Sequence, residues 1–148
     1  MTRFETSVRI SRPIEEVFAF VAEPLNFPRW NSAVRAVRHT GGEAGAVGST
    51  YAMERDLPSG QAQNELEVFA RGRPTEFGIR TTSGPTPFSY RYEFTAANGE
   101  TVVRLDAAVE LEGPAALLGP LAGRAVKRGV DSNFAELKRI LEAAGPPA

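Results

Sequence analysis

The side chains best suited to polar chemistry inside a cavity are six polar residues in phase with apolar strand positions. An arginine and tyrosines in such a setting can orient or polarise a bound molecule, but they are poor bases, because tyrosine ordinarily has a pKa of about 10 and arginine stays protonated. Burying such a group without a partner costs about 1–3 kcal/mol, so each needs a neighbour, a water or a ligand. The six residues are Tyr51, Arg55, Asn64, Thr81, Tyr90 and Tyr92.

Each of these positions has a plainer structural alternative. Arg55 lies one residue from the expected end of its strand, where a long side chain can bend out to solvent. Tyr90 and Tyr92 can pack in the core with their hydroxyls at its margin. Trp30, the only tryptophan, either roofs a pocket or plugs a pair of helices.

Groups that form catalytic or metal sites are scarce in the chain. His39 is the only histidine and there is no cysteine, which disfavours a catalytic triad and a zinc site and predicts a surface histidine. Glu65 and Glu67 alternate with Leu66 and are therefore expected on the solvent face. Residues 41–48 are rich in glycine but lack the Lys-Ser/Thr pair of a phosphate loop, so they predict an ordinary loop. We expect no metal and no cofactor.

The elements that must position these groups are mostly strands. From residue 88 to 95 the even-numbered side chains are aromatic and the odd-numbered ones are polar. This is the pattern of a strand buried on one face. Asn98-Gly99 then predicts a tight hairpin. Seven antiparallel strands are expected, at residues 3–10, 34–40, 50–56, 62–71, 77–81, 88–95 and 103–111.

Helices are expected in two places. Pro13, Glu15 and Glu16 favour a helix start after the first strand, and Pro24 ends that helix before one further turn at 25–31. A long amphipathic helix is predicted from Pro120 to Leu141. The pattern indicates an α+β fold in which a seven-stranded antiparallel sheet wraps around this helix.

We expect ligand-binding side chains on the inner face of that sheet and on the helices that cover it. They comprise the polar groups above and the apolar residues in phase with them. The set is Trp30, Tyr51, Met53, Arg55, Asn64, Leu66, Val68, Phe77, Ile79, Thr81, Phe88, Tyr90, Tyr92, Leu105, Val109, Val126, Val130 and Phe134. Ala70 is expected in phase with Leu66 and Val68.

Length and composition are those of an ordinary globular chain. The 148 residues predict one domain at 1–144 and a tail at 145–148. A formal net charge of -1 disfavours nucleic acid, no apolar stretch predicts a membrane span, and the lack of cysteine fits the cytoplasm. A monomer or homodimer is expected.

The order of strand, helix pair, six strands and long helix resembles the START-like or Bet v 1-like (SRPBCC) helix-grip superfamily, in its polyketide cyclase/dehydrase and lipid-transport branch. The stretches that carry the resemblance are residues 8–18, 28–30, 48–50 and 133–138. The resemblance implies a cavity between the sheet and the terminal helix that takes a lipid, an isoprenoid or a polyketide-like molecule.

Three functions stay open on this basis. The first is non-covalent binding of a small, largely hydrophobic molecule. The second, implied by the resemblance, is an aromatase/cyclase or dehydratase in which Arg55 holds an enolate or carboxylate and a tyrosine moves a proton. The third is a protein-interaction module, which the charged outer face disfavours, because no exposed apolar patch is expected beyond Phe69.

Overall fold

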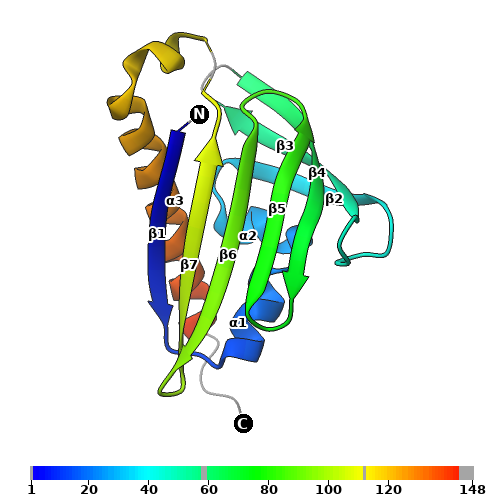
Figure 1. The fold of residues 1–148 in the computed structure, drawn as a ribbon, viewed down its shortest axis with the longest axis vertical. Helices are drawn as coiled ribbons and strands as arrows, with labels where there is room; N and C mark the ends of the chain where they lie inside the picture. The colour runs from blue at the N-terminus through cyan, green and yellow to red at the C-terminus, as the bar shows by residue number, and fades with distance from the viewer. Residues whose placement is uncertain (1, 58–59, 112, 144–148) are drawn as a thin grey trace.

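Seven strands form one antiparallel sheet in the computed structural model of the protein (Figure 1). The structure describes residues 2–57, 60–111 and 113–143, so the predicted tail at 145–148 lies outside the described residues. Across the sheet the order is β1-β7-β6-β5-β4-β3-β2, and β1 and β2 form its edges. The strands are β1 (Thr2–Ile10), β2 (Val34–Gly41), β3 (Thr50–Leu57), β4 (Gly60–Gly72), β5 (Glu76–Ser83), β6 (Phe88–Ala97) and β7 (Glu100–Val109).

The strands from β2 to β7 form a meander in which each one pairs with the next along the chain. The first strand is the exception, because it pairs with the last: Thr2 lies opposite Val109 and Ile10 opposite Thr101. The two edges are therefore β1 and β2, which the chain connects through its short helices.

The helices begin and end where the prolines predict. Pro13 precedes α1, Glu15 and Glu16 occupy its first turn, and Pro24 opens a short 3-10 turn. The predicted helix pair and the long terminal helix are both confirmed. The helices are α1 (Ile14–Val21), η1 (Pro24–Asn26), α2 (Phe27–Trp30), η2 (Gly113–Leu118) and α3 (Pro120–Ala143).

The terminal helix α3 is held more firmly along its second half than along its first. Phe134, Leu137 and Leu141 are buried, and Lys138 Nζ donates a hydrogen bond of 2.8 Å to the backbone oxygen of Arg9. Along the first half, Ala122 is the buried residue. Figure 1 shows this first half behind β1, with its start beyond the end of the sheet.

The predicted phase of β6 is confirmed. Tyr92 and Phe94 are buried, while Arg91 and Glu93 are exposed. The Tyr92 ring lies 6.3 Å from that of Phe134 on α3. The even-numbered side chains of this strand therefore face the helices.

One predicted phase is wrong, because β4 contains a bulge. Val68 lies opposite Ile79, but Ala70 lies opposite Gly78, so one extra residue enters β4 between these two pairs. Ala70 consequently leaves the face it was expected to share with Val68, and Arg71 comes to lie opposite the buried Phe77.

Phe69 is the extra residue of the bulge, and its ring lies on the outer face of the sheet. A Cβ atom at Gly78 would come within 2.6 Å of the Phe69 ring, so glycine is what allows the ring to lie there. The guanidinium carbons of Arg80 and Arg91 lie 5.6 and 5.2 Å from the ring centre. Phe69 is therefore half-buried under two cations instead of forming an exposed apolar patch.

Candidate functional site

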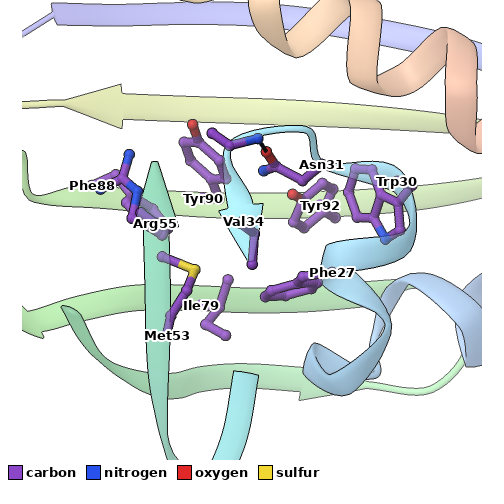
Figure 2. Close-up of a pocket in the computed structure, with 11 residues that line it drawn as sticks. Phe27, Trp30, Asn31, Val34, Met53, Arg55, Ile79, Phe88, Tyr90 and Tyr92 are labelled. Carbon is purple, nitrogen blue, oxygen red and sulfur yellow. Dashed lines mark hydrogen bonds between the residues drawn. The ribbon is translucent and has the colours of Figure 1, made fainter. Parts of the chain in front are cut away.

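A cavity of about 40 Å³ lies on the inner face of the sheet, between α2, the start of β2 and strands β3, β5 and β6 (Figure 2). Aromatic side chains from α2 and β6 supply much of its wall, and Arg55 supplies a charge. The lining residues are Phe27, Trp30, Asn31, Ala33, Val34, Met53, Arg55, Ile79, Phe88, Tyr90 and Tyr92.

The size of this cavity limits what it holds in the conformation seen here. A water molecule takes about 30 Å³ of liquid volume, whereas pockets for small organic ligands measure about 300–1,000 Å³. Room for a lipid or a polycyclic molecule therefore requires the lining side chains to move. Met53, an unbranched and flexible side chain on β3, is among those able to do so.

Arg55 forms the polar end of the cavity. Its Nη1 donates hydrogen bonds to Asn64 Oδ1 at 3.2 Å and to the backbone oxygen of Thr86 at 3.3 Å. Its guanidinium carbon also lies 5.5 Å from the centre of the Phe88 ring. Burial lowers the pKa of Arg55, yet arginine keeps its proton at neutral pH, so the cavity contains a fixed positive charge.

Asn64 positions Arg55 and the connection between β5 and β6. Its side chain is fully buried, and Nδ2 donates to the backbone oxygens of Ser83 and Pro85 at 3.1 and 2.9 Å. Both ends of the amide are therefore used within the protein. Thr81 is used in the same way, since its hydroxyl accepts a 3.0 Å hydrogen bond from Phe88 N.

The two phenols that line the cavity remain without hydrogen-bond partners among the described residues. Burial raises the pKa of Tyr90 to about 12, against the smaller opposing effect of the Arg55 charge. Burial also raises the pKa of Tyr92 well above its ordinary value. Both hydroxyls are therefore protonated at neutral pH and are able to donate to a bound molecule.

Trp30 forms the aromatic end of the cavity, opposite Arg55 in Figure 2. Its ring lies 6.2 Å from that of Phe134 and 6.5 Å from that of Tyr92. These three rings fill the space between α3 and the sheet, so no described residue of α3 lines the cavity. The indole Nε1 is buried and has no hydrogen-bond partner within the described part of the chain.

The structure brings together seven of the eighteen residues expected to bind a ligand and places the others elsewhere. Those that line the cavity are Trp30, Met53, Arg55, Ile79, Phe88, Tyr90 and Tyr92. Buried in the core away from the cavity are Tyr51, Asn64, Leu66, Val68, Phe77, Leu105, Val109 and Phe134. Half-buried positions outside the lining are Thr81, Val126 and Val130.

Tyr51 shows why a phenol on the inner face need not reach the cavity. Its side chain is buried at the other end of β3, and its hydroxyl accepts a 2.8 Å hydrogen bond from Gly45 N. This phenol anchors the predicted loop between β2 and β3, which the structure confirms. It has no role at the cavity wall.

Four lining residues were not expected from the sequence: Phe27, Asn31, Ala33 and Val34. Phe27 and Trp30 are three residues apart on α2, a spacing that places both rings on one side of a helical turn. The turn formed by α2 is therefore a wall of the cavity as well as a cap on α1, and this spacing is the sequence signal for Phe27.

Within the part of the chain that the structure describes, neither a carboxylate nor a histidine lines the cavity. His39 is exposed on β2, as predicted. Among residues 2–57, 60–111 and 113–143, no group of three or more His, Asp or Glu side chains is arranged to hold a metal ion. In the same residues, none of the helices is long and apolar enough to span a membrane.

A larger hollow of about 720 Å³ lies on the outer face of the sheet and is open to solvent. Its wall includes Arg3, Glu5, Arg91 and Asp106. Glu5 and Asp106 pair with Arg104, and Arg91 pairs with Glu76, so these three charges are satisfied within the protein. The inner cavity, with its unbonded phenols, is the better candidate site.

Comparisons with solved structures show the same fold at low sequence identity. A START superfamily protein from Mycobacterium smegmatis aligns with a TM-score of 0.81 at 13% identity, over 98% of this chain and 100% of the other. A protein from Thermus thermophilus aligns with a TM-score of 0.81 at 16% identity, over 97% of this chain and 99% of the other.

A protein with a described pathway also shares the fold. The di-domain ARO/CYC protein BexL from the BE-7585A biosynthetic pathway aligns with a TM-score of 0.73 at 20% identity, over 96% of this chain and 47% of the other. A search of curated protein sequences finds no match. The sequence profile of one family matches residues 1–142, and the chain therefore belongs to the family described as polyketide cyclase / dehydrase and lipid transport.

Proposed function

We propose that the protein binds a small, largely hydrophobic molecule that carries a carbonyl, enolate or carboxylate oxygen, in the cavity between α2 and the sheet. The observation that carries the proposal is the set of donors around an aromatic wall. Arg55 supplies a positive charge, Tyr90 and Tyr92 supply phenol hydroxyls that form no hydrogen bond among the described residues, and Trp30 contributes to the aromatic wall.

The chemistry of these groups selects for acceptors. A ligand oxygen can accept from the phenol hydroxyls, and a hydrogen bond of this kind contributes about 0.5–1.5 kcal/mol, or more when it is to a charged group such as Arg55. A cationic ligand would instead meet Arg55, and no carboxylate among the described lining residues would balance the two positive charges. Covering about 200 Å² of apolar ligand surface adds roughly 5 kcal/mol before the cost of ordering.

A cyclase or dehydratase acting on a polyketide-like substrate is the second candidate. The similarity to a di-domain ARO/CYC protein favours it, as does the position of Arg55 for holding an enolate oxygen. Catalysis would then depend on binding and orientation, because the raised pKa of Tyr90 makes its phenol a poor base near neutral pH.

A displacement assay tests the binding proposal. An environment-sensitive apolar dye should bind with micromolar affinity and should be displaced by fatty acids and by polycyclic aromatic acids, but more weakly by alkylamines of equal length. Tyr90→Ala should weaken dye binding. The matched control is Tyr51→Phe, which changes a tyrosine outside the lining and should leave binding unchanged. Equal displacement by acids and amines would contradict the proposal.

Turnover separates the two candidates. If a polyketide-like substrate is converted by the wild-type protein and conversion is lost in Tyr90→Phe or Arg55→Gln while binding persists, the protein is an enzyme. Binding without conversion supports the binding function alone.

We further propose that residues 1–144 act as one domain, as a monomer or homodimer in the cytoplasm. The single sheet with one continuous core supports the single domain. Gel filtration coupled to light scattering checks the oligomeric state.

A further inference from the structure

The segment that joins β7 to α3 exposes large apolar side chains, contrary to the expectation of no apolar patch beyond Phe69. Leu117 is 88% exposed, Leu118 58% and Leu121 63%. We call these three residues the leucine tip. Figure 1 shows η2 and the start of α3 beyond the end of the sheet, so the leucine tip belongs to a projecting part of the molecule. Neighbouring large apolar side chains that are exposed together are typical of surfaces that contact another apolar surface.

The charged residues that follow the leucine tip along the chain are all positive as far as Val130. The sequence contains no acidic residue from Gly113 to Val130, but it contains Arg124, Lys127 and Arg128. Lys127 pairs with Asp131 at 2.8 Å. Arg124 and Arg128 are exposed and form no ion pair within the described residues.

The geometry places leucine and arginine side chains on one face of α3. Leu121, Arg124 and Arg128 are spaced by three and four residues, so they share a face of the helix. At 1.5 Å per residue the two arginines lie about 5 and about 10 Å from Leu121 along the axis. The arginines thus lie one and two turns behind Leu121. This spacing matches the depth of about 5–10 Å to which the apolar side chains of peripheral helices enter a lipid headgroup layer.

We propose that the leucine tip docks the protein on an anionic lipid surface, with the leucines inserted among the headgroups and Arg124 and Arg128 on the lipid phosphates. A second copy of this chain is a poorer partner, because a symmetric contact through the tip would bring two sets of these cations together. The proposal does not depend on the ligand of the inner cavity.

The tip lies at the end of the molecule that contains Arg55. Glu110 N, just after β7, donates a 2.8 Å hydrogen bond to the oxygen of Pro87, next to Thr86, whose oxygen accepts from Arg55. Docking through the tip would therefore bring the polar end of the cavity toward the lipid surface.

Vesicle flotation with the full chain tests the proposal. Wild-type protein should float with vesicles of phosphatidylglycerol and phosphatidylcholine at low salt, and much less with phosphatidylcholine alone. Leu117→Ser with Leu121→Ser should weaken binding about tenfold or more. Arg124→Gln with Arg128→Gln should weaken it by about 30-fold, since each cation near an anionic surface contributes about fivefold.

The matched control is Val47→Ser with Arg38→Gln, which removes an exposed apolar residue and an exposed arginine from β2 and the loop that follows it. This variant should bind vesicles like the wild type. Leu117→Trp adds a direct reading, because Trp30 is buried and gives a constant background. Its emission should shift to the blue only with anionic vesicles.

Three results would overturn the proposal. The first is no binding of the wild type to anionic vesicles at low salt. The second is binding that the leucine or arginine variants leave unchanged. The third is self-association in solution that the leucine variants abolish, without vesicle binding, which would identify the tip as an interface between copies. Thermal unfolding of each variant should match the wild type, because all the changed residues are exposed.

Discussion

Two arginines on the inner face of the sheet have the same local contacts but lie in different surroundings. Arg55 on β3 lies 5.5 Å from the Phe88 ring and donates to a backbone oxygen at 3.3 Å. Arg71 on β4 lies 5.2 Å from the Phe18 ring and donates to the backbone oxygen of Ala22 at 3.4 Å.

The difference is in what lies beneath each ring. Phe18 is fully buried and packs against Phe94 with ring centres 5.2 Å apart, so the core at that end is filled. Phe88 is half-buried and lines the cavity. The same arginine–phenylalanine pair thus closes a packed core at one end and borders a cavity at the other, which shows that the pair alone does not identify a site.

Removing the two rings should give the largest contrast between these ends. Phe18→Ala should lower the free energy of unfolding by about 3–5 kcal/mol, because a buried ring is lost from a filled core. Phe88→Ala should cost only about 1–2 kcal/mol, since the ring is half-exposed and borders empty space. Denaturant titration measures both, and equal losses would contradict the difference in packing.

The pH dependence of stability should report the buried phenol at the cavity end. The unfolded chain loses the Tyr90 proton near pH 10, whereas the folded protein keeps it up to about pH 12. Protonated Tyr90 therefore stabilises the fold fully below pH 10, and this contribution is lost as the pH rises through 12. The loss amounts to about 2–3 kcal/mol.

Tyr90→Phe should remove this part of the decrease in the free energy of unfolding at alkaline pH, as measured by urea titration at a series of pH values. Tyr51→Phe is the control for a tyrosine outside the cavity. An identical alkaline slope in wild type and Tyr90→Phe would show that the phenol is not protected by burial.

The two arginines should differ in ligand binding. Arg55→Gln should weaken an anionic naphthalene sulfonate dye about tenfold, because a hydrogen bond to a charged group contributes roughly 1.5 kcal/mol or more. A neutral dye of similar size should change less than about twofold by the same reasoning. Arg71→Gln should leave both affinities unchanged. A loss of dye affinity with that variant would mean that the dye binds beside Arg71 and not beside Arg55.

The smallest effect is expected on α3. Val130→Ala should leave dye affinity nearly unchanged, because Val130 lies outside the cavity lining, whereas Val34→Ala alters the lining itself and should change it measurably. Fluorescence titration compares the two. A larger effect from Val130 would show that the bound form opens a space beside α3.

The sequence was sufficient for the elements and for most of the inward face. Alternation is local, so β6 and its even-numbered aromatic residues could be predicted without knowing the fold. Pro24 and Pro120 marked helix boundaries for the same reason. Arg55 could be placed in phase with Met53, although its inward direction depends on Asn64 and Thr86 from other parts of the chain.

The position of the cavity could not be predicted, because it depends on how the elements pack. Phe134, Trp30 and Tyr92 fill the space where a cavity against α3 was expected, and contacts among α3, α2 and β6 are not visible in any one segment. The bulge at Phe69 likewise depends on Gly78 of the neighbouring strand. Periodicity within β4 alone gives no sign of it.

The pairing of β1 with β7 has a consequence for how the protein is made. Because Thr2 lies opposite Val109, β1 leaves the ribosome before the other strands of this sheet and finds its partner only after nearly the whole sheet has been synthesised. The meander from β2 to β7 needs only contacts between neighbours and can form earlier. Until β7 appears, β1 is an unpaired strand with Phe4 and Val8 on one face, and the charges of Arg3, Glu5 and Arg9 on the other oppose its aggregation.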